Sequence, residues 1–170
     1  MSEFEIERKY LIKKPEIAKI EKEVKVEKVL ITQTYLLSEN ETERRVRRKI
    51  VGDKKSFFYT EKITISSIKR IENERKIMET EYNELLKEKD PLLHTINKTR
   101  YVFIFKNQKF EMDFYEFSDE YAILEIEIRE ENEKIMLPDF ITIISDVTED
   151  RKFKNKSLSK TGKLPIDKYI

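Results

Sequence analysis

The sequence predicts a mainly β fold of the α+β class, in which one large antiparallel sheet curls or closes on itself. Three observations support this prediction. Apolar and polar residues alternate with a period of two through most of the chain, as in strands with one buried face. Short connections join most of these segments, which suits antiparallel neighbours. About eight strands result, and a sheet of that size usually curls or closes.

The predicted strands follow one another along almost the whole chain. In the first of them, Glu5, Glu7 and Lys9 lie on one face, while Phe4 and Ile6 lie on the other. The later segments repeat this alternation. The predicted strands cover residues 3–12, 28–38, 43–51, 55–65, 70–81, 96–106, 109–117 and 122–130, with a short one near 143–148.

Only a few short helices are predicted. The first covers residues 15–22 and starts with a proline, which suits a first helical turn. A second covers residues 81–87. The third covers residues 155–160, with Asn155 as its N-cap and Gly162 as its stop.

Local signals assign two further segments. Gly52 and Asp53 lie between two predicted strands and mark a hairpin. Residues 162–170 are expected to form a loosely held tail. No linker or shift in composition divides the chain, so we expect one domain over residues 1–170.

Charge content is the most unusual bulk property of this chain of 170 residues. Charged residues make up 41% of the chain, against roughly 25% in an average globular protein. So charged a chain could be disordered, but 38% hydrophobic residues in regular patterns provide a core. Lys and Arg (35) nearly balance Asp and Glu (34), which leaves a net charge of +1.

The composition also bears on partners and location. A net charge near zero argues against bulk attraction to nucleic acid or to an anionic membrane, so neither is expected as a partner. The absence of cysteine excludes disulfides and thiolate metal sites. No signal peptide is recognised, and no apolar run approaches about 18 residues. We therefore expect a cytoplasmic protein.

Charged residues recur at i, i+2 spacing on one face of most predicted strands, and their signs are segregated. An open sheet with one solvated face explains any single strand of this kind. A solvated face, however, normally mixes small polar and charged residues within each strand. The acidic pairs are Glu5/Glu7, Glu79/Glu81, Glu111/Asp113 and Glu125/Glu127, and the basic pairs are Arg45/Arg47 and Lys98/Arg100.

If the sheet closes, these charged faces line a lumen, and the apolar faces point outward, where helices must cover them. Such a lumen suits a polyanion bound together with a divalent metal ion. Arginine and lysine neutralise and orient phosphate oxygens, and carboxylates hold Mg²⁺ or Mn²⁺. With no cysteine and one histidine in the chain, the available ligands disfavour zinc.

The segment Glu5-Ile6-Glu7-Arg8-Lys9 resembles the ExExK signature of the CYTH superfamily, the triphosphate tunnel metalloenzymes. This signature alone would be weak in a chain so rich in Glu and Lys, but further motifs of the right charge follow in order along nearly the whole chain. They are Gln33-Thr34-Tyr35-Leu36, Arg45-Val46-Arg47, Glu61-Lys62, Glu79-Thr80-Glu81, Lys98-Thr99-Arg100-Tyr101, Glu111-Met112-Asp113, Glu125-Ile126-Glu127 and the segment 147–155.

The resemblance implies an eight-stranded antiparallel barrel, closed into a tunnel with a polar lumen and covered by a few helices. Members of the superfamily include inorganic tripolyphosphatases, thiamine triphosphatases, class IV adenylate cyclases and the RNA triphosphatases of fungal capping systems. This chain looks most like the bacterial tripolyphosphatases. The implied partner is a small-molecule triphosphate, the implied cofactor is Mg²⁺ or Mn²⁺, with two ions bound, and a homodimer is left open.

The resemblance also implies roles for individual residues. Basic residues would grip the phosphates, and carboxylates would hold the metal ions. The phosphate-binding set is Lys9, Arg45, Arg47, Lys62, Lys98, Arg100 and Lys154, with Tyr35 either lining the tunnel or packing beside it. The metal set is Glu5, Glu7, Glu125 and Glu127, with Glu79, Glu81, Glu111 and Asp113 as further candidates. The expected catalytic residues are Glu5 and Glu7, through the metal ion that activates water, and Lys9 or Lys62 as the acid.

One position departs from the pattern of the superfamily. Related sequences often carry a basic residue two places before the acidic pair assigned here to Glu79 and Glu81, and this chain has Ile77 there. Either one phosphate contact is missing, or the register of this strand differs.

Three classes of function stay open on the sequence. The first is hydrolysis of a triphosphate, with thiamine triphosphate as an alternative to inorganic tripolyphosphate. The second is cyclisation of ATP, which needs a base-recognition pocket that the sequence does not reveal. The third is a non-catalytic module that binds polyphosphate or nucleotide. The acidic pairs argue against the third class, because binding phosphate alone requires the basic residues more than the carboxylates.

Overall fold

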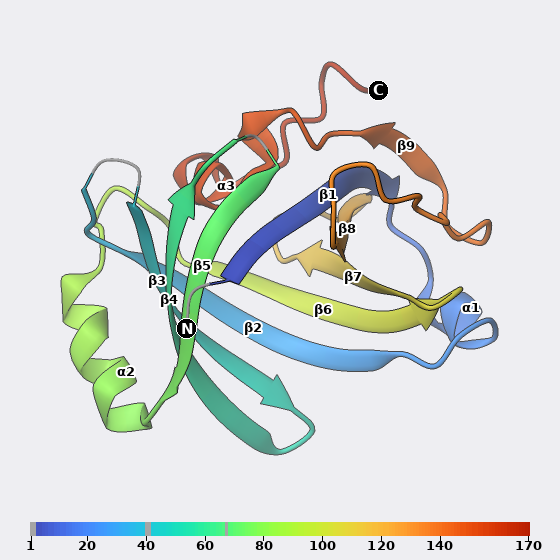
Figure 1. The fold of residues 1–170 in the computed structure, drawn as a ribbon. Coiled ribbons are helices and arrows are strands. Elements are labelled where there is room, and N and C mark those ends of the chain that lie inside the picture. Colours follow the sequence, from blue (N-terminus) through green and yellow to red (C-terminus); the bar gives the residue numbers. More distant parts are fainter. Residues whose placement is uncertain (1–2, 40–41, 67) are drawn as a thin grey trace.

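Antiparallel strands curve round into a closed barrel with helices at its sides in the computed structural model (Figure 1), which describes residues 3–39, 42–66 and 68–170. Within these ranges, eight strands form the barrel and a ninth extends it. The strands are β1 (Glu3–Lys13), β2 (Glu27–Leu36), β3 (Thr42–Val51), β4 (Lys54–Thr64), β5 (Lys69–Ile77), β6 (Ile96–Phe105), β7 (Gln108–Tyr115), β8 (Tyr121–Ile128) and β9 (Ile143–Asp146). The helices are α1 (Ile17–Glu21), α2 (Glu79–Leu85) and α3 (Asn155–Thr161), with 3-10 turns at Leu86–Glu88 and Arg151–Phe153.

The strand order is β5-β4-β3-β2-β6-β7-β8-β1, and a further pairing between β1 and β5 closes the barrel. In this closing pair, Glu5 lies opposite Arg70. The other end of β1 pairs with the short strand β9. Every pairing is antiparallel. The predicted closed eight-stranded barrel is therefore confirmed.

Tight turns join successive strands where the backbone takes positive φ angles. The predicted hairpin at Gly52 connects β3 to β4, with a φ of +62°. Lys106 and Asn107, between β6 and β7, both have positive φ (49° and 63°). Two consecutive residues of this kind are typical of the two-residue hairpin turns whose twist matches that of the strands.

The apolar faces of the strands point outward, and helices cover them in two places, as predicted. Ile20 of α1 packs into a cluster on the outer faces of β1, β6, β7 and β8, which includes Phe110 and Ile126. Tyr82 of α2 packs with Phe57 on the outer faces of β2 to β5. Burial of apolar surface between barrel and helices stabilises the fold here.

A third apolar cluster fills one end of the barrel interior. Leu11 of β1 and Ile123 of β8 continue the inward-facing rows that are charged further along the same strands. They pack with Tyr115 and with Leu158 of α3, all of which are buried. We call the cluster formed by these four residues and their neighbours the end plug. It closes one end of the lumen with α3 and the C-terminal segment.

The C-terminal residues differ from the expected loose tail. Leu164 is buried in the end plug, the Tyr169 hydroxyl donates a hydrogen bond to Asp150 (2.8 Å), and its ring packs against Phe153. These contacts hold the tail against the barrel, so the prediction of a loosely held segment is wrong.

The ends of α3 confirm one prediction and correct another. Gly162 ends the helix with a φ of +65°, which favours glycine. The N-cap is Lys154, not Asn155. Asn155 is occupied elsewhere, since its Oδ1 accepts a hydrogen bond from the Tyr115 hydroxyl (2.6 Å).

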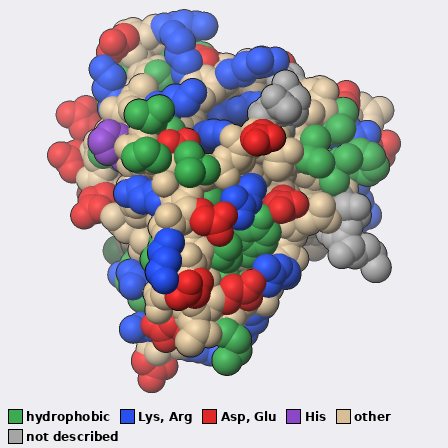
Figure 2. Space-filling view, turned by 90° about the vertical axis from the view of Figure 1, so that its left-hand side faces the viewer, with side chains coloured by type: hydrophobic (Ala, Val, Ile, Leu, Met, Phe, Trp, Pro, Cys, Tyr) green, Lys and Arg blue, Asp and Glu red, His purple; other side chains and the backbone are tan. Residues whose placement is uncertain are grey.

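The outer surface mixes both signs of charge. Figure 2 shows basic and acidic side chains interspersed over the face that carries α2. Some form exposed pairs, such as Lys87 with Glu84, and pairs of this kind contribute little to stability. In the part of the chain that the structure describes, no helix is long and apolar enough to cross a membrane.

A charged tunnel as the candidate active site

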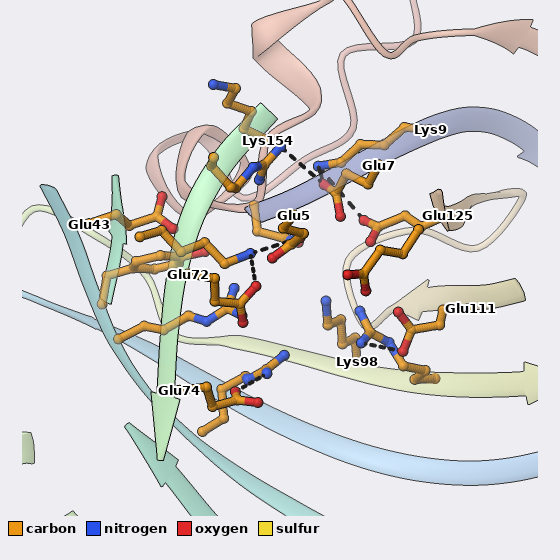
Figure 3. Close-up of a pocket in the computed structure, with 18 of the residues that line it drawn as sticks. Glu5, Glu7, Lys9, Glu43, Glu72, Glu74, Lys98, Glu111, Glu125 and Lys154 are labelled. Carbon is orange, nitrogen blue, oxygen red and sulfur yellow. Dashed lines mark hydrogen bonds and ion pairs between the residues drawn. The ribbon is translucent and has the colours of Figure 1, made fainter. Parts of the chain in front are cut away.

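Inward-facing side chains from all eight barrel strands line one cavity inside the barrel (Figure 3). Because side chains alternate along a strand, residues at i, i+2 and i+4 point into it together. Of the described residues that line it, ten are basic, eight are acidic and three are uncharged. They are Glu5, Glu7, Lys9, Tyr35, Glu43, Arg45, Arg47, Lys49, Lys62, Thr64, Arg70, Glu72, Glu74, Lys98, Arg100, Lys109, Glu111, Glu125, Glu127, Lys154 and Asn155.

Basic partners hold the two carboxylates of β1. Lys62 Nζ lies 3.3 Å from Glu5 Oε1. Glu7 Oε1 lies 3.5 Å from Lys9 Nζ and 3.3 Å from Arg70 Nη2. Both carboxylates are buried, and the nearby cations offset the repulsion between acidic groups two positions apart.

The two carboxylates nevertheless differ in proton affinity. Burial raises the pKa of Glu5 to about 7, with help from the charge of Glu7 and against the opposing effect of Lys62. Burial acts in the same direction on Glu7, but Lys9 and Arg70 outweigh it and hold the pKa of Glu7 well below its usual value. Near neutral pH the pair therefore carries less than its full negative charge, and added positive charge beside Glu5 would complete its ionisation.

Basic residues of β3 and β6 form the opposite wall. Arg45, Arg47, Lys98 and Arg100 are all buried. Arg47 Nη2 donates a hydrogen bond to Glu74 (2.6 Å), yet burial and the charge of Arg45 still lower the pKa of Arg47 to about 10. Because these cations are buried close together, a bound anion would stabilise them.

Lys62 of β4 lies between carboxylates of β1 and β5. Its Nζ is 3.3 Å from Glu5 Oε1 and 3.7 Å from Glu72 Oε2. Burial lowers the pKa of Lys62 to about 8, with Arg45 acting in the same direction. A lysine with such a pKa can lose or gain a proton near neutral pH.

The acidic pair predicted on the fifth strand lies elsewhere. β5 ends at Ile77, and Glu79 and Glu81 belong to the first turn of α2, where acidic residues suit the helix dipole. Arg75 donates two hydrogen bonds to Glu81 at the surface (2.6 and 3.1 Å). The assignment of Glu79 and Glu81 as metal ligands is therefore wrong.

The residues of β5 that line the cavity are Arg70, Glu72 and Glu74. They restore the pattern that seemed broken at Ile77, because a basic residue now stands two places before an acidic pair. Glu74 accepts hydrogen bonds from Arg47 and from Thr60 (2.9 Å). The alternating segment KRIENER, residues 69–75, carries this signal in the sequence, but alternation alone does not show that β5 ends before Glu79.

Asp113 also differs from its expected role as a metal ligand. Its side chain is fully buried and does not line the cavity. Its Oδ2 accepts hydrogen bonds from Lys98 and Arg100, and its Oδ1 accepts one from Arg100. Despite burial, these partners hold the pKa of Asp113 well below its usual value. Both oxygens of Asp113 are thus already paired, and neither is offered to the lumen.

Tyr35 and Lys154 both reach the cavity, at the end that the end plug closes. Gln33 donates a hydrogen bond to the Tyr35 hydroxyl (2.7 Å), and burial raises the pKa of Tyr35. Lys154 stands at the N-terminus of α3, and burial together with the charge of Arg70 lowers the pKa of Lys154. Lining residues that the sequence analysis did not select are Glu43, Lys49, Thr64, Arg70, Glu72, Glu74, Lys109 and Asn155.

The donor groups can be compared with what a divalent cation needs. Among the residues that the structure describes, no three Asp, Glu or His side chains form a ready-made metal site. Mg²⁺, however, usually takes one or two protein carboxylates and completes its shell with water and phosphate oxygens. Glu5 Oε2 is buried and has no hydrogen-bond partner within the described ranges. The carboxylates of β1 and β8, where Glu7 lies opposite Glu127, therefore fit a hard cation that is shared with a phosphate ligand.

Comparison with known proteins supports the fold. No protein-family model and no curated protein matches the chain. Among solved structures, the inorganic triphosphatase NE1496 is 26% identical, with 95% of this chain and 96% of NE1496 covered and a TM-score of 0.59. Two others share the fold. The PH1819 protein from Pyrococcus horikoshii OT3 is 22% identical, covers 75% of this chain and 80% of its own, and has a TM-score of 0.60.

HpAC1 from Hippeastrum, a putative adenylyl cyclase described as having a dominant triphosphatase activity, also shares the fold. It is 13% identical, with 74% of this chain and 80% of HpAC1 covered and a TM-score of 0.52. The closed barrel, its charged lumen, the ordered motifs and the match to NE1496 over 95% of the chain agree with the CYTH superfamily and its triphosphate tunnel fold, which this chain resembles.

Proposed function

We propose that the protein hydrolyses a phosphoanhydride bond of a small-molecule triphosphate, and that its substrate is inorganic tripolyphosphate. The lining of the tunnel carries this proposal, because charged side chains make up all but three of the described lining residues and basic ones are in the majority. A lining of this kind suits a ligand that consists of phosphate groups alone. The likeness to NE1496, an inorganic triphosphatase, supports the same activity.

The uncharged lining residues argue against a nucleotide or thiamine ester. They are Tyr35, Thr64 and Asn155, and the Tyr35 ring already packs with the end plug. Within the described residues, no set of apolar or aromatic side chains faces the cavity to receive an organic ring, as small-molecule pockets normally do. Cyclisation of ATP is disfavoured for the same reason.

The basic wall would bind the phosphates and stabilise the charge of the transition state. Guanidinium groups match phosphate oxygens with pairs of parallel hydrogen bonds. Arg47 pairs with Glu74, and Arg100 with Glu111, so a phosphate group would share or replace these carboxylates. Charge that builds on the transferred phosphoryl group and on the leaving phosphate would meet cations that are already in place.

The carboxylates fit Mg²⁺ or Mn²⁺ as cofactor. Glu5 and Glu7 of β1 would hold the ion together with Glu125 or Glu127 of β8, and Glu111 stands on the neighbouring strand β7. When bound, a divalent cation would neutralise phosphate charge and lower the pKa of a coordinated water.

Lys62 is the favoured acid between the two lysines expected for this role. Its lowered pKa of about 8 lets the ammonium give up a proton near neutral pH, when a leaving phosphate needs one. The Nζ of Lys9 has three protein partners. It contacts Glu7 and Glu125 and donates a hydrogen bond to the carbonyl of Phe153 (3.4 Å).

Incubation of the purified protein with tripolyphosphate, ATP or thiamine triphosphate, each with Mg²⁺ or Mn²⁺, tests the proposal. We expect phosphate release that is fastest with tripolyphosphate and that stops when a chelator removes the metal. The variant Arg47→Gln is expected to lose this release, and Glu79→Gln, on the surface of α2, is a matched control. Cyclic AMP from ATP, or no product from any substrate, would overturn the proposal.

A further inference from the structure

Asp113 of β7 joins two basic residues of β6 from behind the tunnel wall. Its Oδ2 accepts hydrogen bonds from Lys98 Nζ (2.7 Å) and Arg100 Nη2 (2.9 Å), and its Oδ1 accepts one from Arg100 Nε (2.7 Å). The register explains the contacts, since Arg100 lies directly opposite Asp113 in the sheet. One carboxylate thus fixes two long side chains at once.

Asp113 differs from the other carboxylates that pair with the basic wall. Glu72 and Glu74 line the cavity, so an incoming phosphate can reach and replace them. Asp113 is absent from the lining, and its side chain is fully buried. A phosphate in the lumen cannot displace it, so Asp113 keeps its hold on Lys98 and Arg100 while substrate is bound.

The hydrogen bonds to Asp113 leave other N–H groups of the two basic side chains for a ligand. An ammonium carries three N–H groups and a guanidinium five. Within the described residues, Asp113 takes three of these eight and Glu111 takes one, through Arg100 Nη1 (2.9 Å). Lys98 and Arg100 both line the cavity, but the Lys98 side chain is as fully buried as that of Asp113. The N–H groups that a ligand can reach are therefore those of Arg100, whose side chain is 10% exposed.

We propose that Asp113 is a positioning residue of the tunnel, which fixes Arg100, together with Lys98 beside it, so that the free N–H groups of Arg100 meet a phosphate of the substrate. The inference rests on the proposed function. Free lysine and arginine side chains have considerable rotamer freedom, which binding would otherwise have to remove. Holding them in the bound direction beforehand lowers that entropic penalty.

A double-mutant cycle separates positioning from general structural support. Asp113→Asn is made in the wild-type chain and in the double variant Lys98→Gln/Arg100→Gln, and tripolyphosphate binding is measured by calorimetry without metal. We expect Asp113→Asn to raise Kd by roughly ten- to a hundredfold in the first background and by less than about twofold in the second. An equal rise in both backgrounds would overturn the inference.

Two further variants show whether a change in binding comes from misfolding. Thermal unfolding is followed for all of them, and Asp119→Asn, an exposed acidic residue outside the tunnel lining, is the control that should bind as the wild type does. Asp113→Glu keeps the buried charge but moves the carboxylate by one bond. We expect a folded protein with weakened binding, and wild-type Kd in this variant would overturn positioning.

The outcomes also separate this inference from the proposed function. If the wild-type protein binds and hydrolyses tripolyphosphate but Asp113→Asn raises Kd equally in both backgrounds, only the positioning role is refuted. If the wild-type protein neither binds nor hydrolyses it, the proposed function falls and the role of Asp113 falls with it.

Discussion

At the scale of single residues, partners from other strands decide what each charged group of the tunnel does. Glu5 and Glu7 share one face of one strand, yet burial raises the pKa of Glu5, while Lys9 and Arg70 lower that of Glu7. Lys62 and Arg70, which contact these two carboxylates, come from β4 and β5. The chemistry of each glutamate therefore follows from how the barrel closes.

Replacing the ionised carboxylate tests the proposed metal ligands. Glu7→Gln keeps the shape of the side chain and removes its charge, so we expect metal-dependent turnover of tripolyphosphate to fall by roughly a hundredfold or more. The measurement is the rate of phosphate release at increasing Mg²⁺. Glu79→Gln serves as the control and should keep wild-type turnover. Wild-type activity in Glu7→Gln would show that this carboxylate is not needed.

The pH dependence of turnover tests Lys62 as the acid. Since burial lowers the pKa of Lys62 to about 8, the ammonium form is present below that pH and is lost above it. We expect kcat to fall as the pH rises through about 8. In Lys62→Gln, kcat should be low and this fall should disappear. A variant that retains the same fall would assign it to another group.

At the scale of elements, the boundary between β5 and α2 determines which acidic pair enters the tunnel. The strand stops at Ile77, whose partner Phe57 lies in β4, and the helix starts two residues later. The sequence has alternating charges on both sides of this point, at Glu72 and Glu74 and again at Glu79 and Glu81. Only the first pair continues the inward face of a strand.

Two arginines on β5 make a matched comparison. Arg70 lines the tunnel and contacts Glu7, whereas Arg75 is exposed and pairs with Glu81. We expect Arg70→Gln to raise KM for tripolyphosphate by roughly tenfold or more, as for the loss of a hydrogen bond to a charged group. Arg75→Gln should leave KM unchanged. Initial rates over a range of substrate concentrations check both, and similar KM values in the two variants would contradict the assignment of β5.

At the scale of the whole molecule, the barrel interior has two parts. Charged residues line the tunnel cavity, and the end plug, which includes Leu158 of α3, closes one end of it. Leu11 and Ile123 lie on the same rows as the charged residues of β1 and β8, so one inward face changes from polar to apolar along its length. The end plug holds the segment from which Lys154 enters the cavity.

Truncating the end plug tests its contribution to stability. Leu158 is fully buried in it, so Leu158→Ala should lower the free energy of unfolding by about 2–5 kcal/mol. Leu92, which is 82% exposed, is the control, and Leu92→Ala should change it by less than about 0.5 kcal/mol. Urea denaturation measures both. Equal stability of the two variants would mean that α3 is not packed as described.

Alternation along the chain was enough to predict most strands, a large antiparallel sheet that curls or closes, and the segregation of charge onto one face, because the side-chain period of a strand depends on local backbone geometry. The closed eight-stranded barrel was implied by the family resemblance. Ordered charge motifs added the family resemblance and most of the lining, including Lys9, Arg45 and Lys98. The location of Lys62 in the lumen was predicted in the same way.

The tertiary structure decided the rest. Alternation assigns a residue to a face, but it does not say where a strand stops. The predicted acidic pair of the fifth strand was therefore Glu79 and Glu81, whereas Glu72 and Glu74 line the tunnel. It does not say which neighbour a carboxylate meets, so Asp113 resembled a metal ligand until its pairing with β6 was known. Strand ends and cross-strand partners depend on register and closure, which bring together residues far apart in the chain.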